Sequence, residues 1–246
     1  MPQTLTCHYL YILLYAVADL KNEIMFYYYG RKKKIGNKYK LSTKDIIIEP
    51  FAGSAAYSLR KENINKNVIL FEKSKRIYDL WKWLIEVAEY DDIIKLGNIK
   101  KGDKVNEFIK ILHSASKRAF DYKTITVTSV MEANWNSNLP KMAELVGKIK
   151  HWKIYNNCYS EIDNVVGNLD SCWFVDPPYK GDAGTGYSHS SKDIDYDKLS
   201  EWCKNRKGDV IVCEGLDANW LPFEKLTQQS TINGKKNNEL VYYQFH

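Results

Sequence analysis

The stretch CWFVDPPY, residues 172–179, decides the fold class of this chain. It begins as a short apolar run, typical of a strand that is buried on both faces of a parallel sheet. It ends in Asp176 and two prolines, which cannot continue the strand because proline lacks a backbone N–H. Open α/β sheets bind ligands at the carboxyl ends of such strands. We therefore expect an α/β protein with its functional site at this edge of the sheet.

Further strands and helices alternate around this stretch. The other apolar runs that predict strands are residues 46–48, 68–71 and 210–213. The segments with the apolar spacing of helices are residues 55–61, 74–90 (with Ser74 as N-cap) and 195–204. Residues 230–232 and 240–245 flank Asn233-Gly234, a strong hairpin signal. This alternation predicts a mostly parallel sheet with an antiparallel edge.

Residues 91–150 differ in character, because Asn, Ser, Lys and aromatic residues mix there without a clear strand. We interpret them as an inserted, mostly helical lobe. The catalytic domain would then comprise residues 25–90 and 151–246, preceded by an extension, residues 1–24. By composition the lobe is equally a packing decoration or a target-recognition element. In the second interpretation Lys117 and Arg118 contact phosphates, and Asn134, Trp135 and Asn136 contact base edges.

The charge and the cysteines bound the function only broadly. The chain has 36 Lys and Arg against 30 Asp and Glu, which favours a polyanionic partner weakly, since a solvated lysine-rich surface explains it equally well. Five cysteines without a Cys-x-x-Cys pair argue against a disulfide framework and a structural zinc site. The apolar residues 5–20 are too few to span a bilayer. We expect no metal, no membrane partner and a reducing, cytoplasmic location.

The residues that follow the buried strand suit transfer to a planar amino group. Such a nitrogen is a poor nucleophile because its lone pair is delocalised into the ring, so acceptors must hold its N–H groups as it becomes tetrahedral. Asp176 supplies a carboxylate and Pro177 a carbonyl, which Pro178 helps to preorganise. Tyr179 offers a flat face to a base extruded from a duplex. The structural alternative is a proline-stiffened exit from the strand.

A second cluster follows the first expected strand. It comprises Glu49, Pro50, Phe51, Gly53 and Ser54, and Glu72 ends the next expected strand. In nucleoside-binding α/β units a glycine lets the backbone approach the ligand, and an acidic side chain about twenty residues further accepts hydrogen bonds from ribose hydroxyls. Each signal is weak alone, since Gly53 also fits a tight turn and Glu72 a helix N-terminus. Together they favour a nucleoside-containing cofactor.

In the order of these motifs the chain resembles the Dam-type adenine-N6 DNA methyltransferases, also called the D12 class, from about residue 26 to the C-terminus. Tyr29-Gly30-Arg31-Lys32 resembles the family segment Tyr-x-Gly-Gly-Lys, with Arg31 in place of the second glycine. Cys158-Tyr159 stands where the family commonly has Asp followed by Phe or Tyr. The missing Asp removes one family contact to the cofactor adenine.

The resemblance implies a Rossmann-like S-adenosyl-L-methionine-dependent methyltransferase sheet with a C-terminal β-hairpin. The residues it assigns to the cofactor are Tyr29, Gly30, Lys32, Glu49, Pro50, Phe51, Gly53, Ser54, Glu72, Cys158, Tyr159 and Asp176. Residues 176–179 would grip the target base, and Tyr187, in the glycine-rich loop 180–192, would lie near the nucleic acid.

The activity implied by this resemblance is site-specific methylation of adenine N6 in DNA, by base flipping and direct transfer, as in restriction-modification systems. The partner would be DNA, the protein a monomer or a dimer on DNA, and the location a bacterial or phage-host cytoplasm. Cytosine N4, RNA adenine and a protein glutamine amide remain alternative acceptors. A nucleic-acid-binding homologue without catalysis is the alternative from another class.

Overall fold

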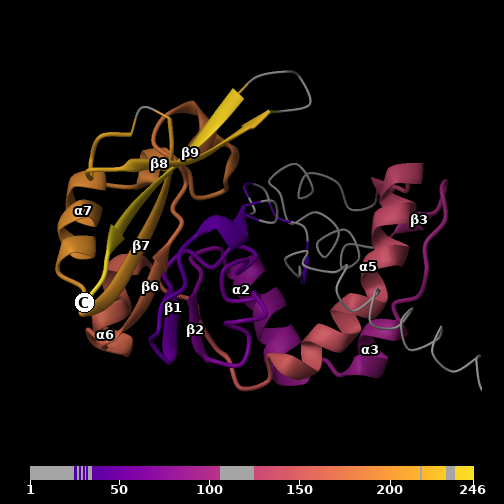
Figure 1. Ribbon diagram of the computed structural model, residues 1–246. Helices are drawn as coiled ribbons and strands as arrows, with labels where there is room; N and C mark the ends of the chain where they lie inside the picture. The colour runs from indigo at the N-terminus through magenta and orange to yellow at the C-terminus, as the bar shows by residue number, and fades with distance from the viewer. Residues whose placement is uncertain are drawn as a thin grey trace, which may run out of the picture.

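The computed structural model describes residues 25–246 except 27, 29, 31, 33, 34, 106–124, 217 and 231–235. A seven-stranded sheet lies at its centre, in the order β5-β2-β1-β6-β7-β9-β8 (Figure 1). The strands are β1 (Ile46–Glu49), β2 (Asn67–Phe71), β5 (Lys153–Tyr155), β6 (Ser171–Val175), β7 (Gly208–Gly215), β8 (Glu224–Ser230) and β9 (Lys236–Gln244). The pairs β5-β2, β2-β1, β1-β6 and β6-β7 are parallel, and β9 is antiparallel to β7 and β8. The predicted α/β class and the antiparallel C-terminal edge are confirmed.

Both faces of the sheet are covered, which explains the apolar runs. In β6, Cys172 and Phe174 face one core cluster, and Trp173 and Val175 face the other. The first cluster includes Trp81 of α2 (Lys75–Lys82), and the second includes residues of α6 (Ile162–Val165) and α7 (Tyr196–Lys204). All five residues of β6 are therefore buried, as a central parallel strand requires.

The strand order reverses between β1 and β6, because β2 and β5 continue on one side and β7 on the other. The crevice at such a switch point, outside the carboxyl ends of the strands, is the ligand-binding position of doubly wound sheets. The chain reaches this edge at the residues after β1, β2, β5 and β6.

Two predicted helices differ from the structure. Residues 55–61 form successive turns instead of a helix, since Ala55 has a φ of +48°, in the left-handed region that interrupts a right-handed helix. The helix predicted over 74–90 divides into α2 and the π-helical η2 (Trp83–Val87). Ser74 precedes α2 without a side-chain cap, and its backbone N–H donates to Glu72 at 2.8 Å.

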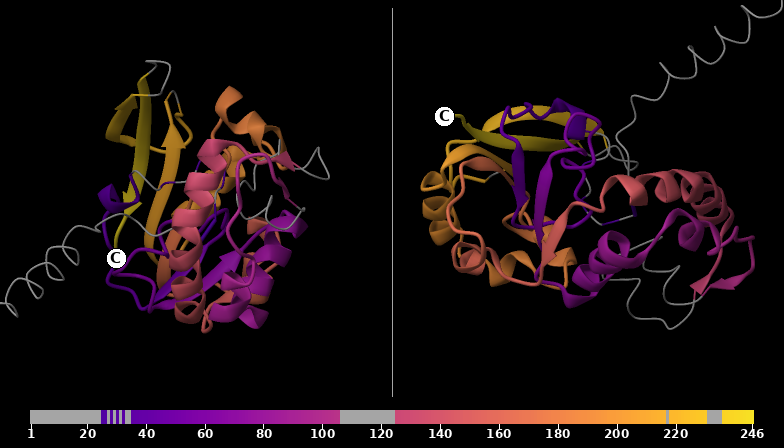
Figure 2. Two further views of the ribbon diagram at one scale, coloured as in Figure 1. Left: turned by 90° about the vertical axis from the view of Figure 1, so that its right-hand side faces the viewer. Right: turned by 90° about the horizontal axis from the view of Figure 1, so that it is seen from below.

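The lobe contains α3 (Tyr90–Ile94), the two-stranded sheet β3 (Lys104–Val105) and β4 (Ile125–Thr126), and α5 (Ser129–Lys148). The small sheet corrects the expectation that this region has no strand. Figures 1 and 2 place the lobe on the opposite side of the molecule from α7. The short 3-10 segments are η1 (Gly36–Lys38), η4 (Tyr159–Glu161), η5 (Asp182–Gly186) and η6 (Ser191–Asp193).

Among the described residues, no helix has the length and apolarity needed to cross a membrane. The predicted extension, residues 1–24, and the turn Asn233-Gly234 lie outside the described residues. The division into a catalytic domain and a recognition lobe stays a prediction.

Phe26 tests the contribution of the first described residues to the core. Its side chain is fully buried, and its ring meets Trp81 edge to face with 5.2 Å between centroids. We expect Phe26→Ala to lower the free energy of unfolding in urea by about 3–5 kcal/mol, the usual loss for a buried aromatic ring. Tyr90→Ala is the control, because Tyr90 is 51% exposed. Equal losses in the two variants would contradict this placement of Phe26.

Candidate functional site

A cavity of about 870 Å³, part of it open solvent, lies at the carboxyl edge of the sheet. The predicted site residues that line it are Gly30, Lys32, Glu49, Pro50, Phe51, Gly53, Ser54, Glu72, Cys158, Tyr159, Asp176, Pro178 and Tyr187. These residues come from segments that are far apart in the sequence. The cavity therefore brings the ends of β1, β2 and β6 together with the amino-terminal segment and the loop after β6.

Glu72 is held at one end of this cavity by backbone groups. Its two carboxylate oxygens accept hydrogen bonds from the N–H of Gly53 at 3.1 Å and the N–H of Ser74 at 2.8 Å. A carboxylate has about four acceptor positions, so this arrangement fixes the side chain and leaves acceptor capacity for ligand hydroxyls. Burial raises the pKa of Glu72 to about 7, against the lowering effect of these two bonds.

The turn at Gly53 depends on the absence of a side chain. Gly53 has a φ of +47°, and a Cβ there would lie 3.1 Å from the ring of Tyr28. Its carbonyl accepts from the Nε1–H of Trp81 at 2.9 Å. The turn is therefore anchored through both its N–H and its carbonyl. Tyr28 also lines the cavity, and the sequence interpretation missed it because it took the neighbouring Tyr29 as the family aromatic residue.

Two aromatic rings form an apolar part of the cavity wall. The rings of Phe51 and Tyr159 have centroids 5.6 Å apart at 32°. They contact each other at this distance, so a planar base would lie against one of them and not between them. The backbone N–H of Cys158 donates to Glu161 at 2.8 Å. Cys158 thus lies at the cavity, as predicted, without the carboxylate of the family position.

Glu49 is the last residue of β1 and lines the cavity. Its carboxylate accepts from the N–H of Ser58 at 3.0 Å and from the hydroxyl of Ser58 at 2.5 Å. These two bonds join β1 to the turns that follow it. Burial raises the pKa of Glu49 to about 8, although both bonds with Ser58 lower it.

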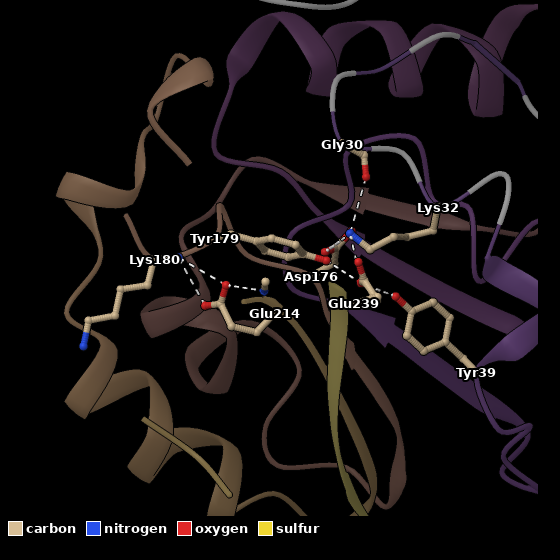
Figure 3. A network of polar contacts seen from close by, with 9 residues as sticks. Gly30, Lys32, Tyr39, Asp176, Tyr179, Lys180, Glu214 and Glu239 are labelled. Carbon is tan, nitrogen blue, oxygen red and sulfur yellow. Dashed lines mark hydrogen bonds and ion pairs between the residues drawn. The ribbon is translucent and has the colours of Figure 1, made fainter. Parts of the chain in front are cut away.

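Asp176 follows β6, and its half-buried carboxylate forms an ion pair with buried Lys32. The Nζ of Lys32 lies 2.7 Å from Oδ1 of Asp176 and 3.7 Å from Oε1 of Glu239 (Figure 3). Burial raises the pKa of Asp176 to about 6, Lys32 lowers it and Glu239 raises it. The pKa of Lys32 is raised, because the two carboxylates outweigh its desolvation. Lys32 of the amino-terminal motif therefore contacts Asp176, the carboxylate that the sequence assigned to the site.

Pro177 and Tyr179 are not among the residues that line the cavity, in contrast to Asp176 and Pro178. The Tyr179 hydroxyl donates to Oε1 of Glu239, and Lys32 Nζ lies 4.5 Å from the centroid of its ring. The ring also packs against Gly215, where a Cβ would lie 2.8 Å from Cδ2. Tyr179 is thus a packed, hydrogen-bonded side chain, and a stacking role for it stays a prediction.

The glycine-rich loop, residues 180–192, contributes to the wall of the cavity. Tyr187 lines the cavity, and its ring lies 6.0 Å from that of Tyr28 at a tilt of 38°. A Cβ on Gly30 would lie only 2.0 Å from the hydroxyl oxygen of Tyr187. The loop and the amino-terminal segment therefore fit together because residue 30 has no side chain. Tyr187 lies beside the predicted cofactor residues, and its nucleic-acid role stays a prediction.

Two of the predicted base-reading residues in the lobe have internal partners. The Nε1–H of buried Trp135 donates to the carbonyl of Gly97 at 2.8 Å. Asn136 accepts from the N–H of Ile99 and donates to its carbonyl, each at 3.0 Å. These bonds join α5 to the segment after α3. The Nε1–H of Trp135 is therefore already used inside the lobe, whereas the half-buried amide of Asn136 keeps a second N–H and further acceptor capacity. Contact of these two residues with base edges stays a prediction.

Three predicted site residues, Tyr29, Lys117 and Arg118, lie outside the described residues. Asn134 is half-buried on α5, and its role in recognition stays a prediction. Among the described residues, no group of three or more His, Cys, Asp or Glu side chains could hold a metal ion.

Comparison with known proteins adds little to this geometry. No family model matches the chain, and no curated protein is significantly similar to it. Among solved structures, a conserved hypothetical protein from Streptococcus pyogenes has 12% sequence identity, a match over 80% of this chain and 84% of that chain, and a TM-score of 0.32. A likeness at this TM-score supports no functional inference.

The buried carboxyls predict how stability depends on pH. Glu49, Glu72 and Asp176 have pKa values of about 8, 7 and 6, above their ordinary values of 4.5, 4.5 and 3.8. Above pH 4.5 the folded protein thus retains protons that the unfolded chain has released. The contribution of proton binding to the free energy of unfolding is therefore lost as the pH rises through the folded pKa values.

We expect the free energy of unfolding in urea to be lower at about pH 8.5 than at about pH 5.5. Glu72→Gln should flatten this dependence, whereas Glu86→Gln, which changes an exposed side chain, should not. A stability that rises across this window would contradict the assigned burial.

Gly30 allows a test of the contact between the loop and the amino-terminal segment. We expect Gly30→Ala to displace Tyr187 and so to speed tryptic cleavage after Lys180 and Lys192 in the loop. Gly102→Ala is a matched control, because Gly102 also has a positive φ, +96°, but no atom lies within 4 Å of its added Cβ. Both substitutions strain the backbone by roughly 1–2 kcal/mol. Equal cleavage rates would show that Tyr187 does not depend on Gly30.

Proposed function

We propose that this protein is an S-adenosyl-L-methionine-dependent methyltransferase that methylates N6 of adenine in DNA. The observation that supports this most is the continuity of one cavity from Glu72 and Phe51, at the ends of β2 and β1, to Asp176 at the end of β6. A site for a nucleoside and an acceptor for an amino group therefore share one space, as a transfer between the two requires.

The residues present fit the cofactor. Glu72 retains acceptor capacity for the two ribose hydroxyls, and Phe51 with Tyr159 offers an apolar wall for the adenine ring. Gly53 lets the backbone approach the ligand closely. When bound, S-adenosyl-L-methionine supplies an electrophilic methyl group on a sulfonium and leaves as S-adenosylhomocysteine.

Asp176 would act on the amino group that receives the methyl. Its Oδ1 is held by Lys32 at 2.7 Å, which orients the carboxylate and leaves Oδ2 to accept an N–H of the substrate. This bond strengthens as the nitrogen becomes positively charged, so it stabilises the transition state more than the ground state. Pro177 and Pro178 restrict the backbone that carries the second acceptor, the carbonyl of Pro177.

The choice of adenine in DNA rests on the motif order of the resemblance. The same acceptor arrangement serves cytosine N4, RNA adenine or a glutamine amide, and a binding protein without catalysis is the competing class. Site-specificity and a restriction-modification context belong to the same proposal. Parallel incubations with tritiated S-adenosyl-L-methionine and unmethylated DNA, RNA or glutamine peptides, with nucleoside digestion of the nucleic acids, separate these alternatives. A binder shifts DNA without labelling it, and chromatography distinguishes N6-methyladenine from N4-methylcytosine.

Asp176→Ala tests the assigned chemistry. We expect kcat to fall by at least about 10²-fold, the usual scale for losing one preorganised electrostatic partner, with little change in cofactor affinity by calorimetry. Asp197→Ala, on the exposed side of α7, is the matched control and should retain activity. Wild-type rates in Asp176→Ala would exclude this residue as the acceptor, and absence of label from DNA, RNA and glutamine peptides with the wild-type protein would refute the proposal itself.

A further inference from the structure

Glu239, on β9, combines two hydrogen bonds and one ion pair at a single carboxylate oxygen. Its Oε1 accepts from the hydroxyl of Tyr39 at 2.5 Å and from the hydroxyl of Tyr179, and it lies 3.7 Å from Nζ of Lys32 (Figure 3). The side chain is only 10% exposed. A buried carboxylate needs such partners, because desolvation strongly disfavours an unpaired charge. The sequence motifs that point to the site do not include this residue.

The position of Glu239 changes the charge of the site. Lys32 and Asp176 alone would form a closed ion pair with no net charge. With Glu239 as a second carboxylate, the buried group of three ionised side chains carries one net negative charge. The hydroxyl donors, Tyr39 and Tyr179, are neutral and do not cancel it. A substrate nitrogen that becomes positive beside Asp176 then meets an excess of negative charge, whose effect is large in a site removed from water.

Glu239 also connects Tyr179 to a rigid part of the protein. Tyr39 is fully packed in the core beside Phe174 of β6, with 5.2 Å between ring centroids. The shared Oε1 therefore links a core residue to the last residue of the predicted catalytic segment. This link fixes the backbone that leaves Asp176, because Tyr179 lies only three residues further along the chain.

We propose that Glu239 is a positioning residue for methyl transfer: it holds Tyr179 through the phenol and gives the group of Lys32, Asp176 and Glu239 a net negative charge toward the substrate amino group. This inference rests on the proposed function. In the transfer, the nitrogen lone pair forms the N–C bond while the C–S bond breaks and its electron pair goes to sulfur. The nitrogen then loses a proton toward Oδ2 of Asp176 and from there to solvent, which restores the carboxylate.

Two variants separate the charge of Glu239 from its hydrogen bonds. Glu239→Gln keeps the length and an acceptor oxygen for the tyrosine hydroxyls but removes the charge. Glu239→Asp keeps the charge but shortens the side chain. We expect Glu239→Gln to lower kcat by roughly 10-fold to 100-fold at saturating DNA and cofactor, and Glu239→Asp to lower it less. Glu224→Gln, which neutralises an exposed side chain on neighbouring β8, is the matched control.

The titration of Asp176 gives a second readout that a merely structural role would not move. The groups that act on Asp176 or respond to it are Lys32, Glu239, Tyr28, Tyr39, Glu49, Tyr179, Cys213 and Glu214. The carboxyl 13C resonance of Asp176, assigned by its loss in Asp176→Asn, should titrate near the pKa of about 6 in the wild-type protein. It should titrate at lower pH in Glu239→Gln, and near the wild-type value in Glu239→Asp.

The two sets of measurements keep the inference apart from the proposed function. The titrations need no substrate, so a wild-type protein that labels no acceptor refutes the function while the charge coupling is still measured. Wild-type rates and an unmoved Asp176 resonance in Glu239→Gln would overturn the role of Glu239. A rate lower in Glu239→Asp than in Glu239→Gln would overturn the role of its charge. If Glu239→Gln does not fold, the titration of Asp176 in the wild-type protein decides. A midpoint of this titration below 3.8, the ordinary pKa of aspartate, would likewise overturn the role of Glu239.

Discussion

The ion pair between Lys32 and Asp176 is the contact on which the arrangement of the site depends. It joins the amino-terminal segment to the end of β6, and Glu239 adds the C-terminal hairpin to the same point. A buried lysine without a partner would be strongly destabilising, so these three segments stabilise one another. The position of the amino-terminal segment in turn places Gly30 against Tyr187 and Tyr28 against Gly53. The cavity wall therefore follows from the pairing of one buried cation.

The fold could be predicted from sequence where apolar runs are long and uninterrupted. In β6 and β7 both faces are buried, so their composition is distinctive. The three-residue β5, with Lys153 and Tyr155 around one buried isoleucine, has too little periodicity to be recognised. The prediction places the edge strand at residues 230–232, whereas β8 covers Glu224–Ser230, because the sequence EKLTQQS is largely polar and has no strand signal. The sequence predicts a helix at residues 55–61, where the structure has turns, because a positive φ at Ala55 has no sequence signal.

The candidate site could be predicted where its residues follow strands closely. Glu49, Glu72 and Asp176 are placed by the sheet itself, since the carboxyl ends of parallel strands meet at one edge. Glu239 required the register of β9, although its alternation with buried Val241 on the same face was a usable signal. The residue types of Trp135 and Asn136 suggested base contacts, yet composition does not show whether a polar atom is already paired within a lobe.

The electrostatics of the cavity explain why so many raised carboxyl pKa values occur together. Glu49, Glu72 and Asp176 are all disfavoured as anions by burial, and Lys32 is the buried cation among the described lining residues. Neighbouring carboxyls add to this effect, since Asp176 raises the pKa of Glu49 and Glu239 raises the pKa of Asp176. Positive charge brought by a ligand would lower all three pKa values and release protons. Deprotonation of Asp176, which the proposed acceptance of an N–H requires, is therefore favoured most when a cationic ligand occupies the cavity.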